Sequence, residues 1–180
     1  MSRLNNDPNF FLVFVVAMLV AVFAVLWWRR GGARRKGSEA TERWILIDGS
    51  NVMHWREGEP DLGTVKTVVT QLIALGYAPG VVFDANAGWK LQGRYLHDQE
   101  FARLLALPKR QVLVVGKGTQ ADPFLLQTAR AFGARIVTND RFRDWATDYP
   151  EVLEPGFLIR GGMRDGRLWL QGVAVEEGAL

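Results

Sequence analysis

Four aspartates lie where the apolar pattern predicts strand ends or helix starts, and together they suit metal-ion chemistry. Asp48 and Asp140 each follow a short apolar run, and Asp122 stands at the start of a helical pattern. Asp144 comes four residues after Asp140, which is about one turn further along a helix. Because crowded carboxylates repel one another, they either take up protons or bind a cation.

The ligand types narrow the choice of cation. The expected ligands are carboxylate oxygens, joined by the side-chain amide of Asn51, and such a set favours Mg²⁺ or Mn²⁺ over zinc or copper. The chain has no cysteine and only two histidines, which excludes thiolate zinc sites and three-histidine metal sites. A bound divalent ion of this kind can activate water and neutralise charge on a phosphate, so the residues point to phosphodiester hydrolysis.

Each of these residues also has a purely structural interpretation. Asp122 precedes Pro123, the pattern of a helix N-cap followed by proline at the first helical position. Asp140 could cap a short helix in the same way, and Asp48 and Asn51 could be turn formers. The whole set is harder to explain structurally, since four carboxylates repel one another in the absence of a cation.

The elements that position these residues alternate between strand and helix. Strands alternating with helices predict an α/β fold with a central, mainly parallel sheet and helices on both faces. In such a sheet the carboxyl ends of the strands share one edge, where ligands bind. A turn at residues 164–167 predicts a C-terminal hairpin. The expected strands are 44–48, 81–83, 111–115, 134–138, 157–160 and 168–171, and the expected helices are 62–75, 95–106, 123–132 and 141–147.

The N-terminal region predicts a membrane anchor. Residues 10–28 are 19 consecutive apolar residues, a helix of roughly 28 Å, long enough to cross a bilayer core. The run ends in two tryptophans and is followed by an arginine cluster, so the positive-inside rule places the C-terminal part in the cytoplasm. We therefore expect a short extracytoplasmic tail (1–9), a transmembrane helix (10–28), a basic Gly/Ser linker (29–42), an α/β domain (43–155) and a C-terminal hairpin extension and tail (156–180).

The charge of the domain limits how it can bind other molecules. Positions 1–36 hold six basic residues and one acid, which leaves 16 basic and 18 acidic residues in 37–180. The domain is therefore not globally basic, and any nucleic-acid binding needs a local patch. We expect the basic linker to lie against anionic lipid headgroups rather than RNA.

Three sequence motifs together resemble a known family. Residues Asp48–Val52 (DGSNV), Gln120–Asp122 (QAD) and Thr138–Asp144 (TNDRFRD) resemble the NYN domain of the PIN-like ribonuclease superfamily, in particular its regnase/MCPIP branch. The resemblance covers about residues 43–155. It implies an endoribonuclease that uses Mg²⁺ or Mn²⁺ on single-stranded or loop RNA.

The resemblance also implies roles for individual residues. Asp48, Asp122 and Asp140 would be metal ligands, directly or through water, and Asp144 would complete the acidic cluster. Asn51 would orient a ligand or the scissile phosphate.

The chain departs from the family pattern at two points. Ala121 replaces a second acid that some members carry, and without cysteines the chain cannot form the zinc finger of the regnase branch. RNA affinity would then rest on the domain itself, with Trp89 or Trp55 as stacking platforms unless they serve only in packing. The candidate RNA-binding residues are Lys90, Arg94, Lys117, Arg141 and Arg143.

Two functional hypotheses follow. The first is a membrane-anchored, metal-dependent endoribonuclease at the plasma or inner membrane, with its domain in the cytoplasm and with RNA, lipid and a second copy of the chain as partners. The second is a non-catalytic RNA-binding or protein-interaction module on the same fold. A phosphoryl-transfer enzyme that uses the same acidic edge is a more distant alternative.

Overall fold

The computed structural model describes residues 42–173, which form a domain around a five-stranded sheet. The strand order is β3-β2-β1-β4-β5, and every neighbouring pair is parallel. The predicted α/β architecture with a central parallel sheet is therefore confirmed. The strands are β1 (Trp44–Asp48), β2 (Ala78–Phe83), β3 (Val112–Val114), β4 (Arg135–Val137) and β5 (Leu158–Ile159).

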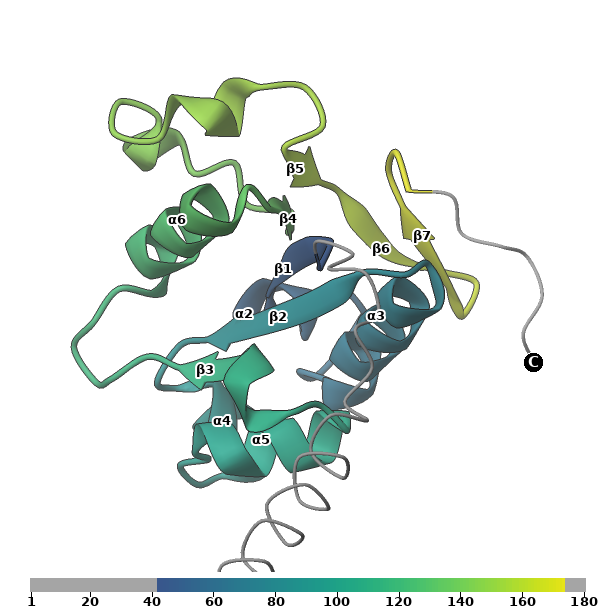
Figure 1. Ribbon diagram of the computed structural model, residues 1–180. Helices are drawn as coiled ribbons and strands as arrows, with labels where there is room; N and C mark the ends of the chain where they lie inside the picture. Colours follow the sequence, from purple (N-terminus) through teal and green to yellow (C-terminus); the bar gives the residue numbers. More distant parts are fainter. Residues whose placement is uncertain (1–41, 174–180) are drawn as a thin grey trace, which may run out of the picture. The chain divides into compact units, whose positions relative to one another are not determined.

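The central strands are buried on both faces because apolar residues continue along them. Ile45 and Ile47 of β1 point into one hydrophobic core, and Leu46 between them points into a second core on the opposite face. This is the pattern expected of a parallel strand covered on both sides. Figure 1 shows α6 (Ala121–Phe132) on one side of the sheet, and α3 (Leu62–Ala74) and α5 (Asp98–Leu105) on the other.

Local signals fix the helix ends. The carboxylate of Asp61 accepts hydrogen bonds from the backbone N–H groups of Gly63 and Thr64, at 2.8 and 3.0 Å, and so caps the start of α3. Two short α-helices, α2 and α4, were not predicted, and the helix expected from residue 95 begins only at Asp98. The remaining helices are α2 (Gly49–Val52), α4 (Ala87–Gln92) and the 3₁₀ helices η1 (Lys109–Gln111), η2 (Arg143–Trp145) and η3 (Pro150–Leu153).

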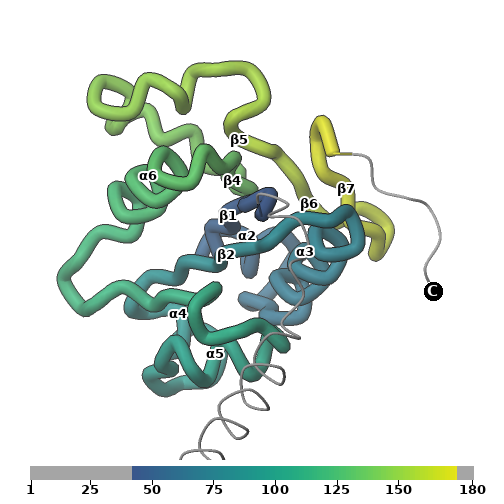
Figure 2. Tube along the Cα trace, viewed as in Figure 1, coloured from purple at the N-terminus to yellow at the C-terminus, as the bar shows by residue number. Residues whose placement is uncertain are grey.

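The C-terminal hairpin forms at the predicted turn, but one of its strands differs from the prediction. Its strands are β6 (Gly161–Arg164) and β7 (Arg167–Leu170), whereas the predicted strand 157–160 contributes β5 to the parallel sheet. Asp165 and Gly166 both have positive φ, 51° and 74°, as a two-residue hairpin turn requires. Figure 2 shows the hairpin beside α3, and Leu170 shares a core with that helix.

The topology places a switch point at one edge of the sheet. The chain moves outward from β1 to β2 and β3, and then returns through α6 to β4 on the other side of β1. The carboxyl ends of β1 and β4 therefore lie at a topological switch point, where α/β folds bind ligands.

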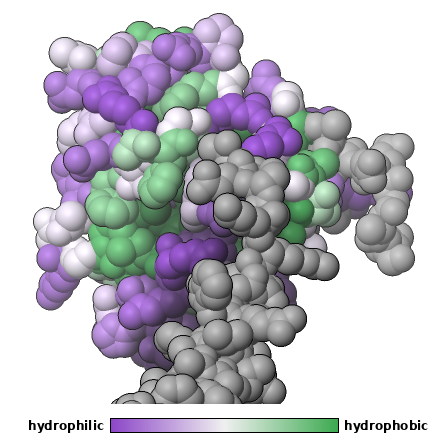
Figure 3. Space-filling view, viewed as in Figure 1, coloured by the Kyte–Doolittle hydropathy of each residue, from purple (hydrophilic) through white to green (hydrophobic). Residues whose placement is uncertain are grey.

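Not all apolar surface is covered by the fold. Phe124 and Phe132 of α6 are 40% and 54% exposed. Figure 3 shows an apolar area below α6, bordered by hydrophilic side chains.

The expected membrane anchor lies outside the described residues, as do the linker up to residue 41 and the tail from residue 174. Within residues 42–173, no helix is both long and apolar enough to span a bilayer.

Candidate active site

The carboxylate of Asp48 lies at the end of β1, at the topological switch point. Its Oδ1 accepts a hydrogen bond from the backbone N–H of Asn51 at 3.1 Å, which caps α2, and its Oδ2 accepts one from the Thr138 hydroxyl at 3.0 Å. Burial raises the pKa of Asp48 from 3.8 to about 6, against the effect of these two hydrogen bonds. The negative charges of Asp122 and Asp140 contribute to this rise. Three carboxylates are therefore close enough to repel one another.

Asp122 reaches this cluster from α6. The residue at the N-cap of α6 is Gln120, and Asp122 is the second residue of the helix, so the interpretation of Asp122 as the N-cap is wrong. Burial raises the pKa of Asp122, and the charge of Asp140 raises it further, while a hydrogen bond with the Trp145 side chain lowers it. The carboxylate is thus available at the cluster rather than being used to cap its helix.

Asp140 follows β4 in a tightly bonded loop. Its backbone N–H donates to the Thr138 hydroxyl at 3.0 Å, and its Oδ1 accepts from the Phe142 N–H at 2.8 Å. The guanidinium of Arg160 donates to the Asp140 carbonyl at 2.9 Å. Asp140 is exposed, so one carboxylate of the cluster faces solvent, where a substrate would arrive.

Asn51 connects α2 to the β4 loop. Its Oδ1 accepts from the Asn139 N–H at 2.9 Å and from the indole N–H of Trp55 at 2.8 Å. These donors fix the orientation of the amide, and its Nδ2 donates to no other described residue. Asn51 is therefore more than a turn former, and its amide nitrogen is available to a ligand.

Asp144 is placed differently from the other three aspartates. The expected helical turn between Asp140 and Asp144 is wrong, because Phe142 adopts a left-handed conformation with φ 46° and only the 3₁₀ helix η2 follows. Asp144 is exposed on η2, and it is not among the charges that shift the pKa of Asp48 or Asp122.

The basic candidates differ in how free their side chains are. Lys90 and Lys117 are exposed, on α4 and on the loop after β3, and Arg141 and Arg143 are exposed around η2. Arg94 is instead bound to Glu100 at 2.7 Å, which orders the start of α5.

The two candidate stacking tryptophans also differ. Trp89 is 57% exposed on α4. Trp55 packs against the core, and a Cβ added at Gly161 would come within 2.6 Å of its ring. Since its indole N–H is bound to Asn51 as well, Trp55 fits a packing role, and Trp89 remains the open platform.

Sequence reasoning missed two residues that organise the site. Thr138 is fully buried and connects Asp48 to the Asp140 backbone. Ser50 accepts a hydrogen bond from the Asp84 N–H at 2.8 Å, which ties α2 to the end of β2. Thr138 is the first residue of the TNDRFRD motif, so its position in the sequence could have indicated a role at the site. For Ser50 the sequence offered no indication of a role other than its place in the DGSNV motif.

The oxygen atoms at the site are of the type that binds Mg²⁺, but they are too few to hold an ion without water. Within residues 42–173, no three His, Cys, Asp or Glu side chains form a group that could hold an ion by themselves. Mg²⁺ commonly uses one or two carboxylates and keeps several waters. The oxygen donors of Asp48, Asp122 and Asp140 fit that mode of binding.

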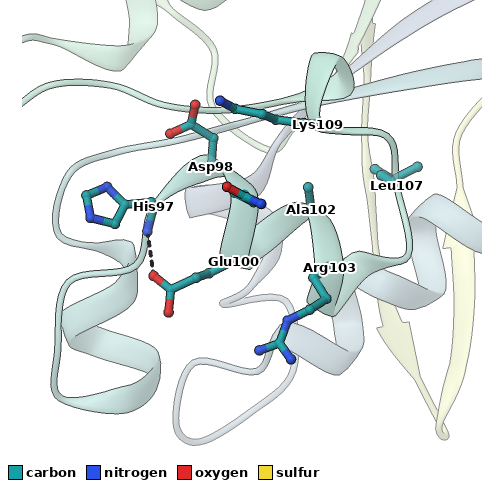
Figure 4. Close-up of a pocket in the computed structure, with 8 residues that line it drawn as sticks. His97, Asp98, Glu100, Ala102, Arg103, Leu107 and Lys109 are labelled. Atoms are coloured by element: carbon teal, nitrogen blue, oxygen red, sulfur yellow. Dashed lines mark hydrogen bonds between the residues drawn. The ribbon is translucent and has the colours of Figure 1, made fainter.

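A separate open pocket lies on α5 and contains none of the candidate catalytic residues. Figure 4 shows His97, Asp98, Glu100, Arg103 and Lys109 around it. The Glu100 carboxylate accepts a hydrogen bond from the His97 N–H at 3.1 Å, so part of its polar lining serves to cap the helix.

Comparison with known proteins gave one family match. Residues 41–154 match the family described as the Zc3h12a-like ribonuclease NYN domain. No curated protein sequence matches the chain.

Solved structures resemble the fold at low sequence identity. Two structures of the protein-only RNase P 2 (PRORP2) of Arabidopsis thaliana superpose with TM-scores of 0.50 and 0.52, at 14% and 16% identity. They cover 95% and 93% of this chain, which spans only 38% and 37% of their own length. At this identity the likeness shows the fold.

Proposed function

The chain belongs to the family of Zc3h12a-like ribonuclease NYN domains, and from this we propose that it is a metal-dependent endoribonuclease acting on single-stranded or loop RNA. The family supports a nuclease-type function. The observation that carries the proposal is the pKa of Asp48, which burial and two neighbouring carboxylates raise to about 6. Such a perturbed group at the carboxyl edge of a parallel sheet is typical of a catalytic site.

In this proposal Asp48, Asp122 and Asp140 hold a divalent ion, Mg²⁺ or Mn²⁺, directly or through water. The ion supplies Lewis-acid chemistry, because it lowers the pKa of water and neutralises charge on the scissile phosphate. Without a cation the three carboxylates repel one another, so the site favours binding one. Asp144 completes the acidic cluster from solvent, through water rather than by direct contact.

The remaining residues orient the substrate. The Nδ2 group of Asn51 is held by the bonds to its Oδ1 and can donate to a phosphate oxygen. The RNA backbone follows exposed cations around the acidic cluster, and one base stacks on Trp89. These cations are Lys90, Lys117, Arg141 and Arg143. Arg94 contributes less than the others because Glu100 neutralises it.

We further propose that residues 10–28 anchor the enzyme in the plasma or inner membrane, with the domain in the cytoplasm. The support is the 19-residue apolar run and the basic cluster that follows it. Tethering in a membrane raises the local concentration of the domain, which favours a homodimer.

The test is an RNA cleavage assay on the full chain in mild detergent. End-labelled single-stranded RNA is incubated with Mg²⁺, with Mn²⁺ or with chelator, and wild type is compared with Asp140→Asn. We expect cleavage that requires the metal and is lost in the variant. Mn²⁺ binding, measured by calorimetry, should weaken in the same variant.

The non-catalytic alternative predicts a different result. Ala121, which replaces an acid found in other members of the family, favours it. If wild type and variant both bind RNA tightly and neither cleaves it with any metal, the chain is an RNA-binding module and not an endoribonuclease.

A further inference from the structure

The two edges of the parallel sheet carry opposite charge. The carboxyl ends of the strands hold the acidic cluster of the candidate active site. The opposite edge, where the strands begin, is basic: Arg43 precedes β1, Arg135 opens β4, and Lys109 and Arg110 precede β3. Acids near it include Glu42, which lies 3.8 Å from Arg110, and Glu151, which pairs with Arg130 in the last turn of α6. We call this edge the basic edge.

Two arginines of the basic edge bind the same tyrosine hydroxyl. The guanidinium groups of Arg43 and Arg135 both donate to the hydroxyl of Tyr77, at 3.0 and 2.6 Å. Arg43 also lies over the Tyr77 ring, 4.4 Å from its centroid. Within residues 42–173, neither guanidinium pairs with a carboxylate. Each keeps unused N–H groups, so the pair is suited to bind an anion with several oxygens, such as a phosphate.

Exposed apolar side chains border the same edge. Helices α3 and α6 lead into strands that begin there, so their C-terminal ends lie at the basic edge. Phe132, the last residue of α6, is 54% exposed and its ring lies 5.1 Å from that of Trp44. Ile73, near the end of α3, is 49% exposed. Cations together with exposed aromatic and aliphatic side chains are the composition of a surface that binds at a lipid interface.

The chain enters the domain at this edge. Residues 1–41 precede Glu42, and they contain the 19-residue apolar run and five basic residues in positions 29–36. Positions 29–41 span at most about 45 Å when fully extended. A domain held on so short a segment meets the membrane surface continually, and the edge next to the tether is the part best placed to touch it.

We propose that the basic edge docks on anionic lipid headgroups, with Arg43 and Arg135 binding a lipid phosphate and Phe132 and Ile73 entering the interface. The acidic edge then points away from the membrane, open to RNA. This inference rests on the membrane anchor in the proposed function. It adds a binding site and an orientation that the anchor alone does not give.

The test measures how close each edge of the full chain lies to lipid. Since the chain has no cysteine, a single cysteine takes one fluorophore. Ala74→Cys, exposed at the end of α3, reports on the basic edge, and Asn86→Cys, exposed before α4, reports on the acidic edge. Each labelled chain is reconstituted into vesicles carrying acceptor lipid, made of phosphatidylcholine alone or with phosphatidylglycerol as a minor component.

We expect phosphatidylglycerol to increase energy transfer at position 74 but not at position 86. The double substitution Arg43→Gln/Arg135→Gln should remove this increase, because each arginine near an anionic surface changes the ratio of docked to undocked domain about fivefold. Salt near 1 M, where the screening length is about 3 Å, should do the same. The matched control Lys90→Gln/Lys117→Gln removes the same charge near the acidic edge and should leave the increase intact.

Several results would overturn the docking. Equal changes at both labels, or equal loss in the control variant, would show a general charge effect. Weaker RNA binding in the Arg43/Arg135 variant, with its vesicle response unchanged, would assign the basic edge to RNA instead.

Failure of the anchor or of the enzyme can be told apart from failure of the docking. If the chain floats with vesicles only when phosphatidylglycerol is present, and only when Arg43 and Arg135 are intact, it docks without a membrane anchor. A chain that floats with neither vesicle does not dock. RNA cleavage is measured separately in detergent, where the Arg43/Arg135 variant should match wild type.

Discussion

Thr138 donates its hydroxyl hydrogen to Oδ2 of Asp48 at 3.0 Å, across the boundary between β4 and β1. The pairing of Ile47 with Val137 sets this contact, because Asp48 and Thr138 are the residues that follow this pair. The same hydroxyl accepts the N–H of Asp140. One buried side chain thus links the carboxylate of Asp48 to the backbone of Asp140.

Replacing Thr138 by valine should weaken both the fold and the site. Valine keeps the shape but leaves the Asp140 N–H and Oδ2 of Asp48 without the Thr138 hydroxyl as a partner. The loss should lower the free energy of unfolding by about 1–3 kcal/mol. The pKa of Asp48 should rise further, since the Thr138 bond holds it down. Urea unfolding and the pH profile of cleavage measure the two effects, and Thr138→Ser should restore both; a serine variant that behaves like valine would contradict this role.

With metal ions removed by a chelator, the stability of the domain should depend on pH because Asp48 titrates. Its pKa is about 6 in the folded domain and 3.8 as the ordinary value, so the folded state binds this proton more tightly than the unfolded chain. The contribution of Asp48 to the free energy of unfolding should therefore fall as the pH rises from about 4 to about 6, by up to about 3 kcal/mol. The raised pKa of Asp122 acts in the same direction.

The control is Asp48→Asn, which should flatten this pH dependence and make the metal-free domain more stable than wild type at neutral pH. Thermal unfolding across the pH range measures both. Added Mn²⁺ should stabilise wild type at neutral pH and leave the variant unchanged. A variant whose stability depends on pH in the same way as that of wild type would contradict the assignment.

The sequence allowed the parallel sheet to be predicted, and with it the acidic edge. Asp48, Asp122 and Asp140 could be brought together in advance because strand ends of a parallel sheet share an edge, whatever the detailed register. The contact between Thr138 and Asp48 depends on the register of two strands 90 positions apart. No local pattern contains that information.

The errors have local physical causes. Phe142 takes a left-handed conformation that apolar residues rarely adopt, so the helical spacing assumed for Asp144 does not exist. Gly161 and Gly162 have low strand propensity, yet they begin β6 because Trp55 and Trp169 fill the space that a side chain would need. In both places tertiary packing overrides local preference.

Asp122 and Asp144 should differ in their effect on catalysis. Asp122→Asn removes a carboxylate that acts on Asp48, and we expect cleavage to fall about 10²–10³-fold, the loss typical of a group that stabilises the reacting charge. Asp144 is exposed on η2, so Asp144→Asn should reduce cleavage only about 10-fold, as for an outer partner of a metal site. Single-turnover rates and Mn²⁺ titrations of both variants measure this difference. Equal losses would place Asp144 among the direct ligands.

Gly49→Ala should disturb the site through packing. A Cβ at Gly49 would lie 2.5 Å from the ring of Phe83, which is fully buried and stacked on Phe101. The overpacking should lower the free energy of unfolding by about 1–3 kcal/mol and displace the neighbouring Asp48. Gly116→Ala is the matched control, because the nearest atom to its Cβ is 3.8 Å away. Chemical denaturation of the two variants separates crowding from a general effect of alanine, and a Gly49 variant as stable as the control would contradict the argument.

The orientation in the membrane can be tested in intact cells. The arginine-rich segment after residue 28 should stay in the cytoplasm, because only Arg3 is basic on the other side of the apolar run. Protease added outside should therefore leave residues 37–180 undigested, and permeabilising the membrane should expose them. Moving the basic cluster from positions 29–36 to the N-terminal side of the run should reverse the orientation and make the domain accessible. Digestion of the wild-type domain in intact cells would overturn the cytoplasmic placement, and with it the access of the acidic edge to cytoplasmic RNA.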